Sequence, residues 1–235
     1  MRLKGKIALV TGGAGGIGRA TVLALAREGA DVAIGYSTSE AEAHETVRLA
    51  EPAGVRALPV QADVTRDDAA RAMVDRVADE LGGLDCLVNN AGWTRRVPHR
   101  RLDDLTDEIW ERVLATNLRG PFYCARAAVP HMKRRGGGAI VNITWVAGAT
   151  GTGSSMAYAA SKGGLDTLTN RWPERSPRRA SGSTRWRRAC SAPASGAGSS
   201  RRSSSSRPDA SPRSGGRSPR RRSPTRWCSC SRIRP

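Results

Sequence analysis

A tyrosine and a lysine lie four residues apart in the segment Tyr158-Ala159-Ala160-Ser161-Lys162. In a helix this spacing places both side chains on one face. A cation beside a phenol favours the phenolate, so Tyr158 could exchange a proton closer to neutral pH. Because such a pair is also common as an ordinary surface contact, its meaning depends on the elements that position it.

A glycine-rich turn near the N-terminus could hold phosphate groups. The turn, Thr11-Gly12-Gly13-Ala14-Gly15-Gly16-Ile17-Gly18, follows the apolar run 6–10 and precedes apolar residues at helical spacing. Glycines let the backbone approach a pyrophosphate, and a helix N-terminus offers free N–H groups and a positive dipole end. The pattern therefore predicts a dinucleotide site, although G-x-x-x-G-x-G differs from the commoner G-x-G-x-x-G.

Strand and helix patterns alternate along the first 170 residues. Short apolar runs predict strands at 6–10, 31–36, 57–61, 84–88 and 139–144. Helical spacing predicts helices from 17 to about 29, and over 40–51, 67–81, 107–135 and 155–171, with a bend at Pro121 or Pro130. This alternation indicates an α/β fold of the Rossmann type, a doubly wound parallel sheet.

Several motifs in this order resemble the short-chain dehydrogenase/reductase family. They are the glycine turn, Asp63-Val64, Asn89-Asn90-Ala91-Gly92, Asn117 in N-L-R-G, and Tyr158 with Lys162 in Y-x-x-x-K. The resemblance covers residues 1 to about 170 and is strongest to the 3-oxoacyl-[acyl-carrier-protein] reductase and glucose dehydrogenase branches.

The resemblance implies an oxidoreductase that reduces a ketone, such as a 3-oxoacyl group, or oxidises the matching alcohol. Tyr158 would be the general acid/base, Lys162 would hold the nicotinamide ribose and lower the pKa of the tyrosine, and Asn117 would position a water. The implied cofactor-binding residues are Thr11, Gly12, Gly16, Ile17, Gly18, Ser37, Asp63, Val64, Asn89, Ala91, Gly92, Tyr158 and Lys162.

One residue departs from the family pattern at a catalytic position. The family's catalytic serine lies thirteen residues before the tyrosine, where this chain has Trp145. An indole is a donor only and is too large for the space of a serine. Thr144 carries a hydroxyl, but neighbouring strand residues point to opposite faces. Loss of one donor to a developing oxyanion costs roughly 10²–10³ in rate, so we expect poor turnover.

The residues after the second predicted strand bear on the choice of cofactor. NAD-preferring relatives tend to carry an acidic residue at this position to accept from the ribose 2′-OH. Here Tyr36 is followed by Ser37, Thr38 and Ser39, so no carboxylate repels a 2′-phosphate. The sequence therefore favours NADP(H) over NAD(H).

The composition changes sharply at residue 171. Residues 1–170 carry a net charge of +2, whereas 171–235 carry +16 and contain one isoleucine but no Leu, Val, Phe, Met or Tyr. Such a segment buries too little apolar surface to fold, so we expect a disordered tail and a C-terminally incomplete sheet. Taken at face value, the tail resembles arginine–serine segments, which makes a nucleic-acid or acidic-partner binding protein the alternative function.

A shifted reading frame is a second interpretation of the tail. Back-translation of 171–189 into GC-rich codons, read in another frame, can give L-A-G-A-L-A-P-A-G-I-R-V-N-A-V-A-P-G, and the same shift at 223–235 can give A-D-A-V-V-F-L-L-S-D-Q-A. Both strings resemble segments of the family.

The resemblance also implies a homo-oligomer, because members of the family form them. Here such an assembly is doubtful, because Pro173 would shorten a helix of the interface.

Other features favour a cytoplasmic protein without a membrane segment, since no signal peptide or long apolar run is visible. The five cysteines show no metal-binding spacing. The basic loop 93–101 could contact an acidic carrier or a phosphorylated substrate, or be an ordinary solvated loop.

Overall fold

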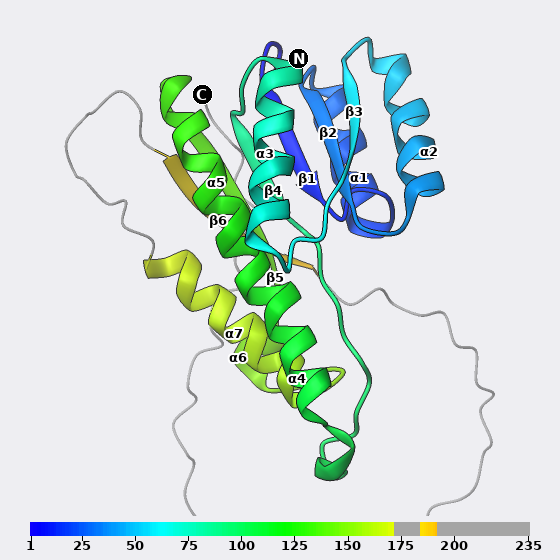
Figure 1. The fold of residues 1–235 in the computed structure, drawn as a ribbon, viewed down its shortest axis with the longest axis vertical. Helices are drawn as coiled ribbons and strands as arrows, with labels where there is room; N and C mark the ends of the chain where they lie inside the picture. Colours follow the sequence, from blue (N-terminus) through cyan, green and yellow to red (C-terminus); the bar gives the residue numbers. More distant parts are fainter. Residues whose placement is uncertain (172–183, 192–235) are drawn as a thin grey trace, which may run out of the picture. The chain divides into compact units, whose positions relative to one another are not determined.

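The computed structural model describes residues 1–171 and 184–191. Strands β1 to β6 form one parallel sheet in the order β3-β2-β1-β4-β5-β6 (Figure 1). This is the doubly wound order, in which the chain starts at the centre and builds outward in both directions. The predicted fold class is confirmed.

The central strands are apolar runs because helices cover both faces of the sheet. All five residues of β1 (Ile7–Thr11) are buried, as are five of the six in β2 (Asp31–Tyr36). The other strands are β3 (Ala57–Gln61), β4 (Cys86–Asn89) and β5 (Gly138–Trp145). The five predicted strands therefore form within one or two residues of their expected bounds.

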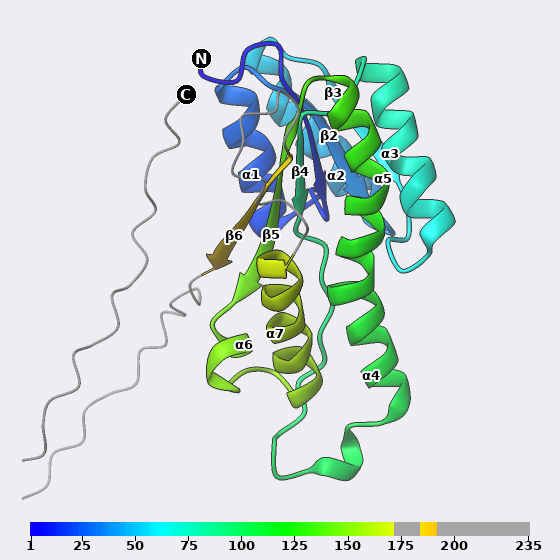
Figure 2. The same cartoon turned by 90° about the vertical axis from the view of Figure 1, so that its left-hand side faces the viewer.

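Two helical layers enclose the sheet (Figure 2). Helices α1 (Gly16–Arg27) and α2 (Glu40–Ala50) pack on one face, where Val22 and Ala43 join the core formed by β1 and β2. Helices α3 (Asp67–Leu81) and α5 (Gly120–Arg134) pack on the other face, where Met73 and Met132 join a second core. The long helix α7 (Met156–Arg171) contacts β5. Short helices lie at η1 (Glu51–Ala53), η2 (Leu102–Asp104) and α6 (Ala147–Thr150).

The helix expected over 107–135 is interrupted. It consists of α4 (Asp107–Leu114), a π-helical turn η3 (Ala115–Arg119) and α5. Pro121 lies in the first turn of α5, where a missing N–H group is tolerated. The expected bend therefore takes the form of a π-turn, a feature often found at functional sites.

The sheet has one strand that the sequence analysis placed in a disordered tail. Residues Thr184–Ser191 form β6, which runs parallel to β5 with Gly138 opposite Thr184. The expectation is wrong for these eight residues. Without a neighbour, β5 would present unpaired N–H and C=O groups at the sheet edge, and β6 pairs with that edge. The remaining tail expectations, including the nucleic-acid alternative, lie outside the described residues.

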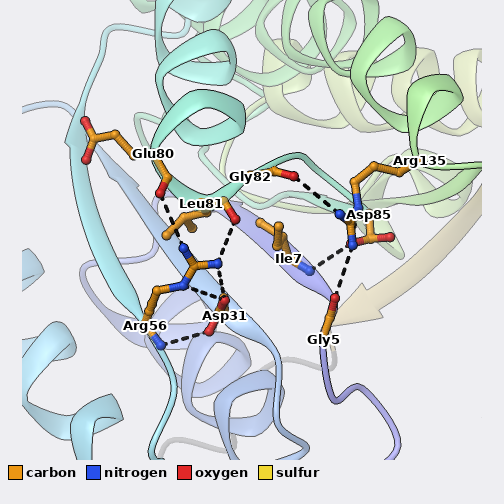
Figure 3. Close-up of polar contacts among 9 residues, drawn as sticks. All are labelled: Gly5, Ile7, Asp31, Arg56, Glu80, Leu81, Gly82, Asp85 and Arg135. Atoms are coloured by element: carbon orange, nitrogen blue, oxygen red, sulfur yellow. Dashed lines mark hydrogen bonds and ion pairs between the residues drawn. The ribbon is translucent and has the colours of Figure 1, made fainter.

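Two arginines fasten the C-terminal end of α3 to the amino ends of the strands (Figure 3). Arg56 binds the Asp31 carboxylate through Nε at 2.8 Å and donates to the Leu81 carbonyl at 2.7 Å. Arg135 donates from Nε to Asp85 at 3.0 Å and from Nη1 to the Gly82 carbonyl at 3.3 Å. These contacts satisfy carbonyls that a helix end leaves without partners.

No helix among the described residues is long and apolar enough to cross a membrane. Within the same residues, no cluster of His, Cys, Asp and Glu side chains is arranged to hold a metal ion. Cys228 and Cys230 lie outside the described part of the chain.

Candidate active site

A cavity of about 840 Å³ opens where the strands end at their carboxyl edge. Gly12 follows β1, Ser37 follows β2, Ala62 follows β3 and Ala91 follows β4, and all four line it. Ligands of open α/β sheets bind at this edge, where the strand order reverses. Six predicted cofactor residues line the cavity: Gly12, Ser37, Asp63, Val64, Ala91 and Gly92.

The glycine turn has the backbone that a phosphate cradle requires. Gly12 and Gly16 adopt positive φ angles of 64° and 52°, which side chains with a β-carbon rarely adopt. A β-carbon on Gly18 would collide with the Gly12 carbonyl, whereas the space beside Gly16 is open. Ile17 is 49% exposed at the start of α1. The turn therefore fits a pyrophosphate at a helix N-terminus.

Thr11 and Asn90 lock this turn to the end of β4. The Thr11 hydroxyl accepts from the backbone N–H groups of Asn90 and Ala91, each at 3.1 Å. The Asn90 amide donates to the carbonyls of Thr11 at 3.1 Å and Gly12 at 3.0 Å. The sequence analysis did not assign a role to Asn90, although it is the second residue of the N-N-A-G motif that drew attention to Asn89.

Two polar residues shape the cavity wall away from the turn. The Asp63 carboxylate accepts from the Thr65 N–H at 2.9 Å, which fixes the chain after β3. The Gln61 amide donates to the Ser37 carbonyl at 2.9 Å. The segment 36–38 therefore lies in the wall with the Ser37 carbonyl held from β3.

Asn89 takes part in a buried network rather than in the cavity lining. Its amide donates to Asn142 Oδ1 at 2.8 Å and to the Pro121 carbonyl at 3.3 Å, and Asn142 donates to Thr169 Oγ1 at 2.9 Å. Asn89 and Asn142 are both nearly inaccessible to solvent. The network links β4, β5 and α7, so it holds the helix that carries Tyr158 against the sheet.

Tyr158 and Lys162 lie on α7 as predicted, and the Lys162 ammonium is 5.7 Å from the centre of the Tyr158 ring. Lys162 is 5% exposed and donates to the Ile143 carbonyl at 2.8 Å. Burial lowers the pKa of Lys162 to about 8. Burial also raises the pKa of Tyr158, so the expected lowering of the tyrosine pKa is wrong for this structure.

Asn117 lies in the π-turn η3 and is fully buried. Its side chain accepts from the Trp93 N–H at 2.7 Å and donates to the Trp93 carbonyl at 2.9 Å. It also donates to Ser161 Oγ at 3.2 Å, and Ser161 donates to the Tyr158 carbonyl at 2.7 Å. Asn117 therefore connects the loop after β4 to the helix that carries Tyr158.

Trp145 ends β5 beside Tyr158. The two rings meet edge to face, with their centroids 5.6 Å apart. Thr144 is 1% exposed, and Trp145 is half-buried with its indole against Gly153. An aromatic ring thus occupies the neighbourhood of the tyrosine where the family pattern has a small hydroxyl side chain.

The model of the short chain dehydrogenase family matches residues 6–178. The chain belongs to the short-chain dehydrogenase family. It is 42% identical over 164 residues to the 3-oxoacyl-[acyl-carrier-protein] reductase FabG of Staphylococcus aureus, covering 70% of this chain and 65% of that protein.

Two solved structures are also similar, the first of them described as a short chain dehydrogenase. One, from Burkholderia cenocepacia in complex with NADP, has a TM-score of 0.67 and 44% identity, covering 72% of this chain and 67% of the other. An NAD⁺-bound xylitol dehydrogenase has a TM-score of 0.68 and 34% identity, covering 72% and 64%. The chain spans 57% and 65% of the length of the first two curated relatives.

Proposed function

We propose that this short-chain dehydrogenase binds NADP(H) and carries out slow reduction of a ketone, or oxidation of the matching alcohol. The observation that carries the proposal is the cavity at the carboxyl edge of the sheet, which contains six of the residues expected to bind the cofactor. The tyrosine and lysine of α7 would provide the proton chemistry; they do not line the cavity, and Asn117 connects their helix to its lining residue Trp93.

The residues on α7 would handle the proton. When bound, the nicotinamide supplies or accepts the hydride. Tyr158 gives its phenolic proton to the substrate oxygen during reduction and takes it back during oxidation. Lys162, held by the Ile143 carbonyl, provides a buried cation that a cofactor ribose can approach. Asn117 holds the loop at Trp93 to the helix at Ser161 through hydrogen bonds of its side chain.

The end of β2 and the residues after it support a preference for NADP(H), whereas the acidic residues that line the cavity, Asp63, Glu108 and Glu111, come from other segments. Tyr36, Ser37 and Thr38 line the cavity, and none carries a negative charge that would repel a 2′-phosphate. The hydroxyls of Ser37 and Thr38 can donate to phosphate oxygens. The solved relatives include one bound to NADP and one bound to NAD⁺, so the preference rests on these residues.

Trp145 is the reason for slow turnover in this proposal. Its indole packs on Tyr158 where a serine hydroxyl would donate to the substrate oxygen. We propose a 3-oxoacyl-like substrate, small or attached to an acyl carrier, because the FabG relative is named for such a reaction. The exposed arginines Arg95, Arg96, Arg100 and Arg101 support an acidic substrate.

A shifted reading frame remains our proposal for the sequence after residue 170. The curated relatives align over 164–168 residues of the 235 in this chain, which supports a loss of the family pattern near that point. Resequencing the gene tests it, because an unbroken frame through codon 170 would exclude the shift.

Equilibrium binding followed by turnover tests the function. Titration of the purified protein with NADPH and NADH, followed by nucleotide fluorescence, should give the lower Kd for NADPH. Reduction of an acetoacetyl thioester should then be slow but dependent on protein and NADPH. A lower Kd for NADH would contradict the cofactor preference, and turnover at ordinary enzyme rates would contradict the role of Trp145.

A further inference from the structure

Arg19 lies in the first turn of α1, directly after the glycine-rich turn. A cation at this position opposes the helix dipole, since the N-terminal end of a helix is already positive. Neither the dipole nor an ion pair with an acidic residue of the same turn explains it, because the first turn of α1 contains no acidic residue. Its contacts give a different reason for its presence.

Arg19 reaches back to the glycine turn and across to α2. Its Nε donates to the Ala14 carbonyl at 3.1 Å and to Thr46 Oγ1 at 3.0 Å, and its Nη2 donates to the Glu42 carbonyl at 3.2 Å. The Thr46 hydroxyl lies 3.2 Å from the Ala14 carbonyl and 2.9 Å from the Glu42 carbonyl. Two donor groups therefore lie within hydrogen-bond distance of the Ala14 carbonyl, Arg19 from α1 and Thr46 from α2.

The groups that Arg19 meets at Ala14 and Thr46 are buried, and Arg19 itself is half-buried. Thr46 is fully buried, and Ala14 is 5% exposed. A threonine in a helix commonly donates to the carbonyl four residues earlier, here Glu42. When the single Thr46 proton is used there, the Arg19 guanidinium is the donor that satisfies the buried Ala14 carbonyl.

The direction of one carbonyl fixes the direction of an N–H group in the glycine turn. A trans peptide unit is planar, so the Gly15 N–H points opposite to the Ala14 carbonyl. Gly15 is the N-cap of α1, and its N–H belongs to the turn that would face a phosphate. Holding the carbonyl toward α2 therefore orients this N–H before any ligand arrives.

We propose that Arg19 and Thr46 are positioning residues for pyrophosphate binding, acting through the Ala14 carbonyl. The inference rests on the proposed binding of a dinucleotide. It does not require hydride transfer, so the effect of Trp145 on turnover leaves it unchanged. The ligand class is any adenosine diphosphate group, whichever cofactor the protein prefers.

The experiment compares ligands with and without a pyrophosphate. The Kd values of NADPH, ADP-ribose and adenosine 2′-monophosphate are measured for the wild type, Arg19→Met and Thr46→Val. Met keeps an unbranched stem without the guanidinium, and Val keeps the shape of threonine without the hydroxyl. Arg27→Ala, at the exposed last turn of the same helix, is the matched control. Unfolding in urea without ligand is measured for every variant.

We expect Arg19→Met to raise the Kd values of NADPH and ADP-ribose about tenfold, an effect of the size of one or two hydrogen bonds. The Kd of adenosine 2′-monophosphate should stay unchanged. Thr46→Val should also raise the Kd values of NADPH and ADP-ribose. Thr46→Ser should bind both ligands as the wild type does, because it keeps the hydroxyl. Arg27→Ala should bind all three ligands as the wild type does.

Two results would overturn the proposal. Unchanged binding of ADP-ribose by both variants would show that the turn is oriented without these residues. An equal loss for all three ligands would show a general weakening of the fold. If the wild type binds neither NADPH nor ADP-ribose, the proposed function fails together with the proposal, whereas the first two results leave the function standing.

Discussion

At the scale of single residues, Trp145 is the side chain to which the proposed function attributes slow turnover. Its ring lies edge-on to Tyr158 at 5.6 Å between centroids. Trp145→Ser should raise the rate of NADPH-dependent ketone reduction by roughly 10²–10³, the usual worth of one donor to a developing oxyanion. The measurement is the initial rate with an acetoacetyl thioester. Trp145→Ala is the control, because it removes the bulk of the indole and adds no hydroxyl. A rate for Trp145→Ser no higher than that of the wild type would contradict this role.

Lys162 makes the stability of the free protein depend on pH. Its pKa falls from 10.5 in the unfolded chain to about 8 in the folded protein because of burial. Between these values the unfolded state binds more protons at Lys162, so the contribution of Lys162 to the free energy of unfolding should rise with pH from 8 to 10, by on the order of 2 kcal/mol. The thiols of Cys86 and Cys124, whose pKa burial raises from 9.0 to about 12, act oppositely from about pH 9, and Tyr158 does so above about pH 10.

Urea unfolding at pH 7, 8, 9 and 10 measures this dependence on the wild type and Lys162→Met. The free energy of unfolding of the wild type minus that of the variant should rise over this range, because the variant buries no ammonium while both proteins contain Cys86 and Cys124. Comparing slopes rather than absolute stabilities removes the cost of leaving the Ile143 carbonyl without its donor. Equal slopes for the two proteins would contradict the burial of a titrating ammonium.

At the scale of elements, the sequence predicted the five strands and the long helices because apolar periodicity reports burial directly. It could not predict the π-turn at Asn117, since proline marks a bend but not its geometry. It missed β6 because the Arg-rich segment 184–191 lacks the apolar pattern of a buried strand. Asn89 was expected at the cofactor but lies in a buried network, which the motif alone does not reveal.

The hydrogen bonds between Asn117 and the Trp93 backbone lead to a prediction for the loop that follows β4. Asn117→Ala removes both partners of the Trp93 backbone, so it should lower the free energy of unfolding by about 1–3 kcal/mol. It should also speed trypsin cleavage at Arg95 and Arg96, which are exposed in this loop. Ser161→Ala, which removes only one contact of Asn117, is the control and should change both measurements less. Unchanged cleavage in Asn117→Ala would show that the loop is held elsewhere.

At the scale of the whole molecule, the carboxyl and amino edges of the sheet have different roles. The carboxyl edge carries the cavity and the open glycine turn, whereas the amino edge is closed by charged groups (Figure 3). Asp85 is 6% exposed there and accepts from the Ile7 N–H at 3.0 Å, from Arg135 at 3.0 Å and from Lys6 at 3.2 Å. One carboxylate thus joins the start of β1 to the end of α5.

This division predicts that the amino edge can be weakened without changing cofactor binding. Asp85→Asn should lower the free energy of unfolding by about 1–3 kcal/mol, because it removes the charge that the partly exposed Arg135 and Lys6 face and leaves one oxygen where the carboxylate had two. The Kd for NADPH should stay within about twofold of the wild-type value at temperatures where the variant is folded, a difference of under 1 kcal/mol. Asp68→Asn is the control: Asp68 also pairs with an arginine, Arg66, but both are exposed, so little stability should be lost. If Asp85→Asn weakened NADPH binding in proportion to stability, the two edges would be one cooperative unit, and the carboxyl edge would not be a preformed site.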